Sequence, residues 1–376
     1  MVTILNRSLF LRKLGGMKAL IALLAASALM MSACGDSTPT EAAQSDDAQT
    51  DQPSGDAQDA AAEADQPSEE QPTIVVSTNI MGDVVENVVG DAATVVTIMP
   101  VGADPHDFQP SAKQIAELND ADAVIMNGGG FEEGLLDIVE AAEADGMIVF
   151  EAMSVIETLE FSGHDDHDDH EDDHDDHDDH EDDDDHDDHD DDHKHEHADG
   201  DPHFFTDPAR VALAADAIAE FVIAEVDGID GAAVRATADD YVAELTALDE
   251  EISEALSAVA DADRVLVTNH EVLAYFADRY DFEIIGAVIP GGTTVDSANA
   301  EALAELAEIV EAEGIPAIFS DNSSSDELAQ TLALEAGNVE VVELYSESLG
   351  AEDSDGATYV EMMRTNAERI AAALTR

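Results

Sequence analysis

Residues 73–99 read TIVVSTNIMGDVVENVVGDAATVVTIM. The stretch opens with a β-branched run at residues 73–77, continues with an amphipathic segment at 80–89, and returns to a β-branched run at 94–99. Short strands that alternate with helices are typical of a parallel sheet covered by helices on both faces. We therefore expect an α/β fold that begins at Thr73.

The same alternation continues along the chain and predicts two lobes. A further amphipathic pattern near Pro208 begins with Asp207 as its expected N-cap. The other predicted strands cover residues 123–126, 147–150, 264–268, 283–289, 316–319 and 339–344, and the other predicted helices cover 111–120, 132–144, 208–226 and 357–374. The predicted fold class is thus α/β with two lobes, each a mainly parallel four-stranded sheet flanked by helices.

One long helical pattern separates the two sets of strands. Between Gly231 and Val259 the apolar residues recur at steps of three and four, without a helix breaker. A helix of this length would measure about 43 Å, which is longer than a small domain is wide. We expect it to link the lobes, with an N-terminal lobe at residues 73–229, a linker helix at 230–260 and a C-terminal lobe at 261–376.

The N-terminus has the pattern of a secreted lipoprotein. Basic residues precede an apolar run at residues 19–31, which is too short to span a bilayer comfortably because a spanning helix needs about 20 residues. The run ends in Met31-Ser32-Ala33-Cys34-Gly35, which resembles a bacterial lipobox. We expect a signal peptide at residues 1–33 that starts at Met1 or Met17, and a lipid on Cys34 that anchors the protein to the outer face of the cell membrane.

Residues 34–72 are predicted to form a disordered acidic tether, because after Cys34 they contain no aromatic and no large aliphatic residue. Cys34 is the one cysteine of the chain, so the sequence excludes intramolecular disulfides and thiolate metal sites. The formal charge is −76, from 89 acidic and 13 basic residues, which argues against nucleic acid as a partner and favours cations.

Residues 164–197 form a low-complexity tract that repeats His-Asp-Asp. The tract contains 11 histidines, 22 acidic residues and Lys194, and it has no apolar residue to bury. Imidazole and carboxylate groups both bind divalent metals. Because a flexible segment loses entropy on each binding event, we expect the tract to be a disordered loop whose several weak sites collect metal.

The three histidines outside the tract are His106, His203 and His270. Each follows or precedes a predicted element at a loop end, where open α/β sheets place their ligand sites. A proline before His106 and before His203 restricts the backbone there. Zinc prefers four ligands that include imidazole nitrogen and carboxylate oxygen, so these histidines are candidate zinc ligands.

Five motifs between Thr73 and Arg376 occur in a characteristic order: Asp104-Pro105-His106, Asp201-Pro202-His203, Asn269-His270-Glu271 with Tyr275-Phe276, Leu344 to Gly350, and Tyr359 to Met363. With these motifs the chain resembles the cluster A-I solute-binding proteins of zinc and manganese ABC importers. The resemblance implies two lobes that hold one metal between them, with His106 and His203 from the first lobe and His270 and Glu347 from the second. Asp321 is an alternative source of the carboxylate, because the family commonly has aspartate where this chain has Glu347.

The resemblance favours Zn²⁺ as the transported ligand over Mn²⁺. Manganese-specific members usually have glutamate at the third position, where this chain has His270, and nitrogen ligands favour zinc. The expected partner is the permease of an ABC importer, the expected state is a monomer, and no enzymatic activity is expected. Three alternatives remain: a manganese-binding member of the family, a zinc-dependent hydrolase with Glu271 as general base, and a surface metal buffer in which the tract binds the metal.

Overall fold

The computed structural model describes residues 71–159, 200–289, 291–294 and 299–375, which belong to one compact unit, Pro67–Arg376. The predicted signal peptide, Cys34, nearly all of the predicted tether and the tract at residues 164–197 lie outside the described residues. Within these ranges, no helix is both long enough and apolar enough to span a bilayer.

The first lobe contains a parallel sheet of four strands in the order β2-β1-β3-β4. This sheet confirms the predicted alternation of strands and helices. The strands are β1 (Thr73–Val76), β2 (Thr94–Thr97), β3 (Ala123–Met126) and β4 (Val149–Glu151), and the helices between them are α1 (Asn79–Val89), α2 (Ala112–Asn119) and α3 (Leu136–Ala144).

The second lobe repeats the same topology, with the strand order β6-β5-β7-β8 and parallel pairing throughout. Its strands are β5 (Val265–Thr268), β6 (Glu283–Ala287), β7 (Ala317–Asp321) and β8 (Glu340–Leu344). Its helices are α6 (Ala274–Tyr280), α7 (Ala300–Glu313), α8 (Glu327–Glu335) and α9 (Tyr359–Leu374). In each sheet the first strand along the chain, β1 or β5, lies between the second and the third strand. The second and third strands are therefore added on opposite sides of the first. Such a reversal of strand order places a crevice at the carboxyl ends of the central strands.

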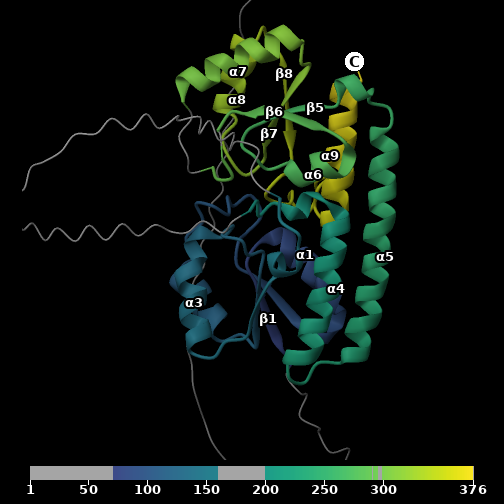
Figure 1. Ribbon diagram of the computed structural model, residues 1–376. Coiled ribbons are helices and arrows are strands. Elements are labelled where there is room, and N and C mark those ends of the chain that lie inside the picture. Colours follow the sequence, from purple (N-terminus) through teal and green to yellow (C-terminus); the bar gives the residue numbers. More distant parts are fainter. Residues whose placement is uncertain (1–70, 160–199, 290, 295–298, 376) are drawn as a thin grey trace, which may run out of the picture. The chain divides into compact units, whose positions relative to one another are not determined.

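Helix α4 (Pro208–Glu225) packs on α1 of the first lobe, and helix α5 (Gly231–Leu256) follows it and connects the lobes. The carboxylate of Asp207 accepts a hydrogen bond from the backbone N–H of Ala209 at 2.8 Å, which confirms it as the N-cap of α4. Helix α5 packs against α4 and α1 on one side and against α9 of the second lobe, so it runs along both lobes as the linker helix (Figure 1). The helix ends at Leu256, three residues before the predicted end at Val259, although Val259 is still buried.

The largest hydrophobic core is shared by the two lobes. It contains side chains from β1 and α1 of the first lobe, from the inner face of α5, and from β5 and α9 of the second lobe, for example Val84, Leu248 and Met362. Two smaller clusters lie apart from it, one around α2, α3 and β3 and one around α7, α8 and β7. The shared core packs the two lobes against each other along α5.

Candidate metal centre

Four buried side chains from both lobes converge in the crevice. One possible ligand atom from each of His106, His203, His270 and Glu347 lies within 4.8 Å of the other three. All four residues are at most 4 % exposed. The structure therefore brings together the four residues that the resemblance implied as ligands, although they are spread over the chain from position 106 to position 347.

Each of the four side chains is held at the end of a strand or beside a helix. His106 lies in the loop between β2 and α2, and His203 immediately precedes a short 3₁₀ helix, Phe204–Thr206, that leads into α4. His270 follows β5 by two residues, and Glu347 follows β8 by three. Two ligand candidates thus come from each side of the crevice, so the distances among them depend on how the lobes pack.

The three imidazoles point the same ring nitrogen at one oxygen. The Nε2 atoms of His106, His270 and His203 lie 2.8, 3.0 and 3.3 Å from Oε1 of Glu347. The ring centroids of the histidines are 5.5 to 5.9 Å apart. Three nitrogens and one oxygen that converge in this way are the donor set that tetrahedral zinc sites use.

Asp201 holds the imidazole of His203. Its Oδ1 atom accepts hydrogen bonds from the backbone N–H of His203 at 2.8 Å and from Nδ1 of the ring at 2.6 Å. The backbone carbonyl of Asp201 in turn accepts a hydrogen bond from the hydroxyl of Tyr275 at 2.6 Å. A carboxylate that accepts from Nδ1 leaves Nε2 free to bind a cation and makes it a better ligand.

The charges at the centre depend on this geometry. Burial alone would lower the pKa of His203, but the charge and hydrogen bond of Asp201, together with Glu347, raise it to about 9. Burial also disfavours the charged form of His270, but Glu347 raises its pKa above the ordinary value. Burial alone would raise the pKa of Glu347, yet the three imidazoles lower it well below its usual range. The carboxylate therefore stays ionised.

Aromatic and acidic side chains surround the histidines of the first lobe. Phe131 meets His106 and His203 edge-on, with ring centroids 5.1 and 5.3 Å apart. The neighbouring Glu132 is fully buried and accepts hydrogen bonds from Ser77 and from the backbone N–H groups of Asn127 and Gly128, so it fixes the loop that carries Phe131. Burial raises the pKa of Glu132 to about 7, against the lowering effect of these hydrogen bonds.

The other two predicted carboxylates lie outside the converging group. Both oxygens of Asp321, at the end of β7, accept hydrogen bonds from serines: Oδ1 from Ser346 at 2.7 Å and Oδ2 from Ser323 at 2.6 Å. Burial and the charge of Glu347 raise the pKa of Asp321 to about 6. Glu271 is buried next to His270, and its backbone N–H donates to the carbonyl of Gly291 at 3.1 Å.

The sequence analysis missed the roles of Asp201, Phe131, Glu132 and Ser323. A signal was available for Asp201, because an aspartate two residues before the histidine can accept a hydrogen bond from the backbone N–H of that histidine. No comparable local signal marks the part the other three play at the site, because the contacts that tie them to it are with residues distant in the sequence: Phe131 with His106 and His203, Glu132 with Ser77, and Ser323 with Glu347.

Comparison with known families identifies the family of this chain. The model of the family "Zinc-uptake complex component A periplasmic" matches residues 74–373. The chain belongs to this family. It is therefore a solute-binding protein of a metal ABC importer, and the family's members are binding proteins rather than enzymes.

The relatives of this chain are named for two different metals. The manganese-binding lipoprotein MntA of Halalkalibacterium halodurans is 26 % identical over 305 residues, which are 81 % of this chain and 88 % of the relative. The zinc-binding protein TroA of Treponema pallidum is 26 % identical over 314 residues, 81 % of this chain and 90 % of TroA. A solved structure of TroA has a TM-score of 0.68 at 24 % identity and covers 81 % of this chain and 100 % of the solved chain, which confirms the two-lobe fold.

Proposed function

We propose that this protein captures Zn²⁺ outside the cytoplasm and delivers it to the permease of an ABC importer. The observation that supports this most directly is the convergence of His106, His203, His270 and Glu347 through single ligand atoms within 4.8 Å. The cation is the transported cargo, and the side chains of the protein bind it without catalysing a reaction. Lipidation of Cys34 would keep the protein at the membrane, and fractionation of cells carrying Cys34→Ala would test that anchor.

Zinc is the proposed cargo because the donor set is rich in nitrogen. Three imidazoles and one carboxylate match the four-ligand sets of zinc, whereas manganese prefers carboxylate, carbonyl and water oxygens. The carboxylate we assign is Glu347, since Oε1 lies within 3.3 Å of all three Nε2 atoms while both oxygens of Asp321 are already hydrogen-bonded.

The two alternatives from other classes have less support. A hydrolytic zinc site keeps a coordination position open for water, but here four protein side chains converge. A general base at position 271 would also need to face that water, and Glu271 is not part of the converging group. A surface buffer would require only the tract at 164–197, so it offers no reason for four buried groups from two lobes to meet.

Deletion of residues 164–197 tests the proposed function. We expect the shortened protein, purified and loaded with excess zinc, to retain one tightly bound zinc per chain while the total stoichiometry falls. Metal analysis after dialysis gives the stoichiometry, and competition between Zn²⁺ and Mn²⁺ gives the preference. Loss of the tight site on deletion would support the buffer, and turnover of ester or peptide substrates by the zinc-loaded protein would support the hydrolase.

A substitution at Asp201 tests the support of the ligand. We expect Asp201→Asn to weaken zinc binding by about 10- to 100-fold, the usual effect of removing an outer partner of a ligand histidine. The matched control is Asp104→Asn, because Asp104 holds the corresponding position in the other Asp-Pro-His motif. Its carboxylate accepts a hydrogen bond from the backbone N–H of His106 at 3.0 Å but none from the ring of His106. Equal losses in both variants, measured by competition with a chelator, would contradict a special role for Asp201.

A further inference from the structure

The two oxygens of Glu347 have different surroundings. Oε1 receives all three imidazole contacts, at 2.8 to 3.3 Å. For Oε2, the hydrogen-bond contact among the described residues is the hydroxyl of Ser323 at 3.4 Å, which is too long for a strong bond between a hydroxyl and a carboxylate. Oε2 is therefore held much less firmly than Oε1.

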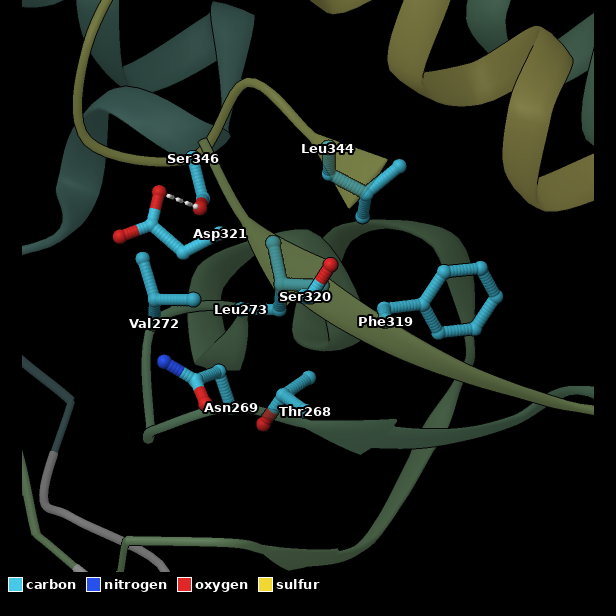
Figure 2. A pocket seen from close by; sticks show the side chains of 9 residues that line it. All are labelled: Thr268, Asn269, Val272, Leu273, Phe319, Ser320, Asp321, Leu344 and Ser346. Atoms are coloured by element: carbon cyan, nitrogen blue, oxygen red, sulfur yellow. Dashed lines mark hydrogen bonds between the residues drawn. The ribbon is translucent and has the colours of Figure 1, made fainter. Parts of the chain in front are cut away.

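Asp321 explains why this contact is long. A serine hydroxyl has one proton to donate, and the hydroxyl of Ser323 lies 2.6 Å from Oδ2 of Asp321, within the range of a strong charge-assisted bond. Asp321 is itself fixed, because its Oδ1 accepts from the hydroxyl of Ser346 at 2.7 Å and from the backbone N–H of Ser323 at 3.1 Å. Asp321 thus draws the proton of Ser323 away from Glu347. Figure 2 shows the hydrogen bond between Asp321 and Ser346 on the wall of a small cavity at the end of the second sheet.

A weakly held Oε2 changes what the carboxylate can bind. The terminal torsion of a glutamate is broad, so the carboxylate turns readily when one oxygen lacks a firm partner. A carboxylate that offers both oxygens suits a cation that prefers oxygen ligands and more than four of them, such as Mn²⁺. A carboxylate held by one oxygen suits a four-coordinate cation such as Zn²⁺.

We propose that Asp321 and Ser323 set the metal selectivity of the centre by leaving Oε2 of Glu347 free to form a second bond to an oxygen-preferring divalent cation. Both are positioning residues that act through Glu347, and the inference rests on the proposed function, in which Glu347 binds the cargo. The three histidines favour zinc, and the free oxygen narrows that preference so that Mn²⁺ is still accepted.

The substitution Asp321→Asn reverses the direction of the hydrogen bond between residue 321 and the hydroxyl of Ser323. The backbone N–H of Ser323 and the hydroxyl of Ser346 both face Oδ1, so the amide oxygen of the asparagine takes that position and its NH₂ group faces the hydroxyl of Ser323. The hydroxyl then accepts from residue 321 and donates to Oε2. We expect the ratio of the dissociation constants for Mn²⁺ and Zn²⁺ to rise about tenfold, the effect of one hydrogen bond to a charged group.

The double variant Asp321→Asn with Ser323→Ala separates this effect from a simple loss of charge. Without the hydroxyl, the ratio should return to the value of the unsubstituted chain, whereas a charge effect would persist. Asp326→Asn is the matched control, because it removes an exposed aspartate five positions away and should leave the ratio unchanged. All variants are compared in the chain that lacks residues 164–197, with Zn²⁺ and Mn²⁺ as probes and circular dichroism as the check on folding.

Co²⁺ gives a second measurement that needs no substitution. Visible absorption of Co²⁺ is weaker in five-coordinate than in four-coordinate sites, so we expect intermediate absorption in the unsubstituted chain and stronger absorption in Asp321→Asn. Strong four-coordinate absorption in the unsubstituted chain, an unchanged ratio in Asp321→Asn, or a shift that persists in the double variant would each overturn the inference. Failure of the unsubstituted chain to bind either metal at one ion per chain would instead refute the proposed function.

Discussion

Replacement of His203 by alanine is expected to weaken zinc binding at least about 100-fold, because loss of an outer partner alone already costs about 10- to 100-fold. His203 is fully buried, and Asp201 holds its ring with Nε2 directed at Glu347. The variant removes a proposed ligand and leaves the charge of Asp201 buried beside the gap. Isothermal titration with zinc, in the chain that lacks residues 164–197, measures the loss.

Tyr275→Phe is the control for this experiment. The substitution removes the hydroxyl that donates to the carbonyl of Asp201 but leaves all four ligand candidates in place. We expect it to keep tight zinc binding, with a modest decrease in thermal stability. Zinc binding by His203→Ala within a few-fold of the unsubstituted protein would rule out His203 as a ligand.

The affinity for zinc is expected to fall by about 500-fold between pH 9 and pH 6 through His203 alone, because half of the rings are neutral at a pH equal to the pKa and each unit well below it lowers the neutral fraction about tenfold. The pKa of His203 is raised to about 9, so the ring is a cation at neutral pH and must lose a proton before Nε2 binds zinc. Two carboxylates explain this charge, because Asp201 accepts from Nδ1 and Glu347 lies at Nε2. The raised pKa of His270 acts in the same direction.

The range from pH 7 to pH 9 decides this prediction. Histidines with an ordinary pKa of about 6.5 would give a nearly constant affinity there. Glu347 stays ionised over this range because its pKa is lowered well below the usual value, so it does not offset the slope. Titrations in buffers of different ionisation enthalpy should also show proton release on binding at pH 7.5. A flat affinity without proton release would show that His203 is neutral in the metal-free protein.

Much of the fold follows from local patterns. The β-branched runs on either side of α1 form β1 and β2, as expected. The apolar residues that recur at steps of three and four in α5 form its buried face from Val234 to Leu256. The boundaries were less accurate. The helix expected at 132–144 begins as a 3₁₀ turn at Glu133–Leu135 before α3, because Glu132 is drawn inward to accept hydrogen bonds from Asn127 and Gly128.

The site was predictable only in part. The histidines could be found because they are few outside the tract and stand at the ends of predicted elements. The choice between Glu347 and Asp321 could not be made from the sequence, since Asp321 ends β7, Glu347 follows the neighbouring β8, and only the three-dimensional contacts show which carboxylate meets the histidines. The contact of Ser323 with Glu347 was hidden for the same reason, because it joins the segment after β7 to the segment after β8 through side chains.

The shared hydrophobic core has a consequence for how such proteins diversify. Because α1, α5 and α9 bury one another, a fragment that ended near residue 260 would expose a broad apolar face, and so would its complement. Neither half is a self-sufficient module, and recombination that exchanged one half with a distant homologue would disturb the seam along its whole length. New preferences for cargo are therefore expected to arise through single replacements beside the crevice, as at positions 321 and 323.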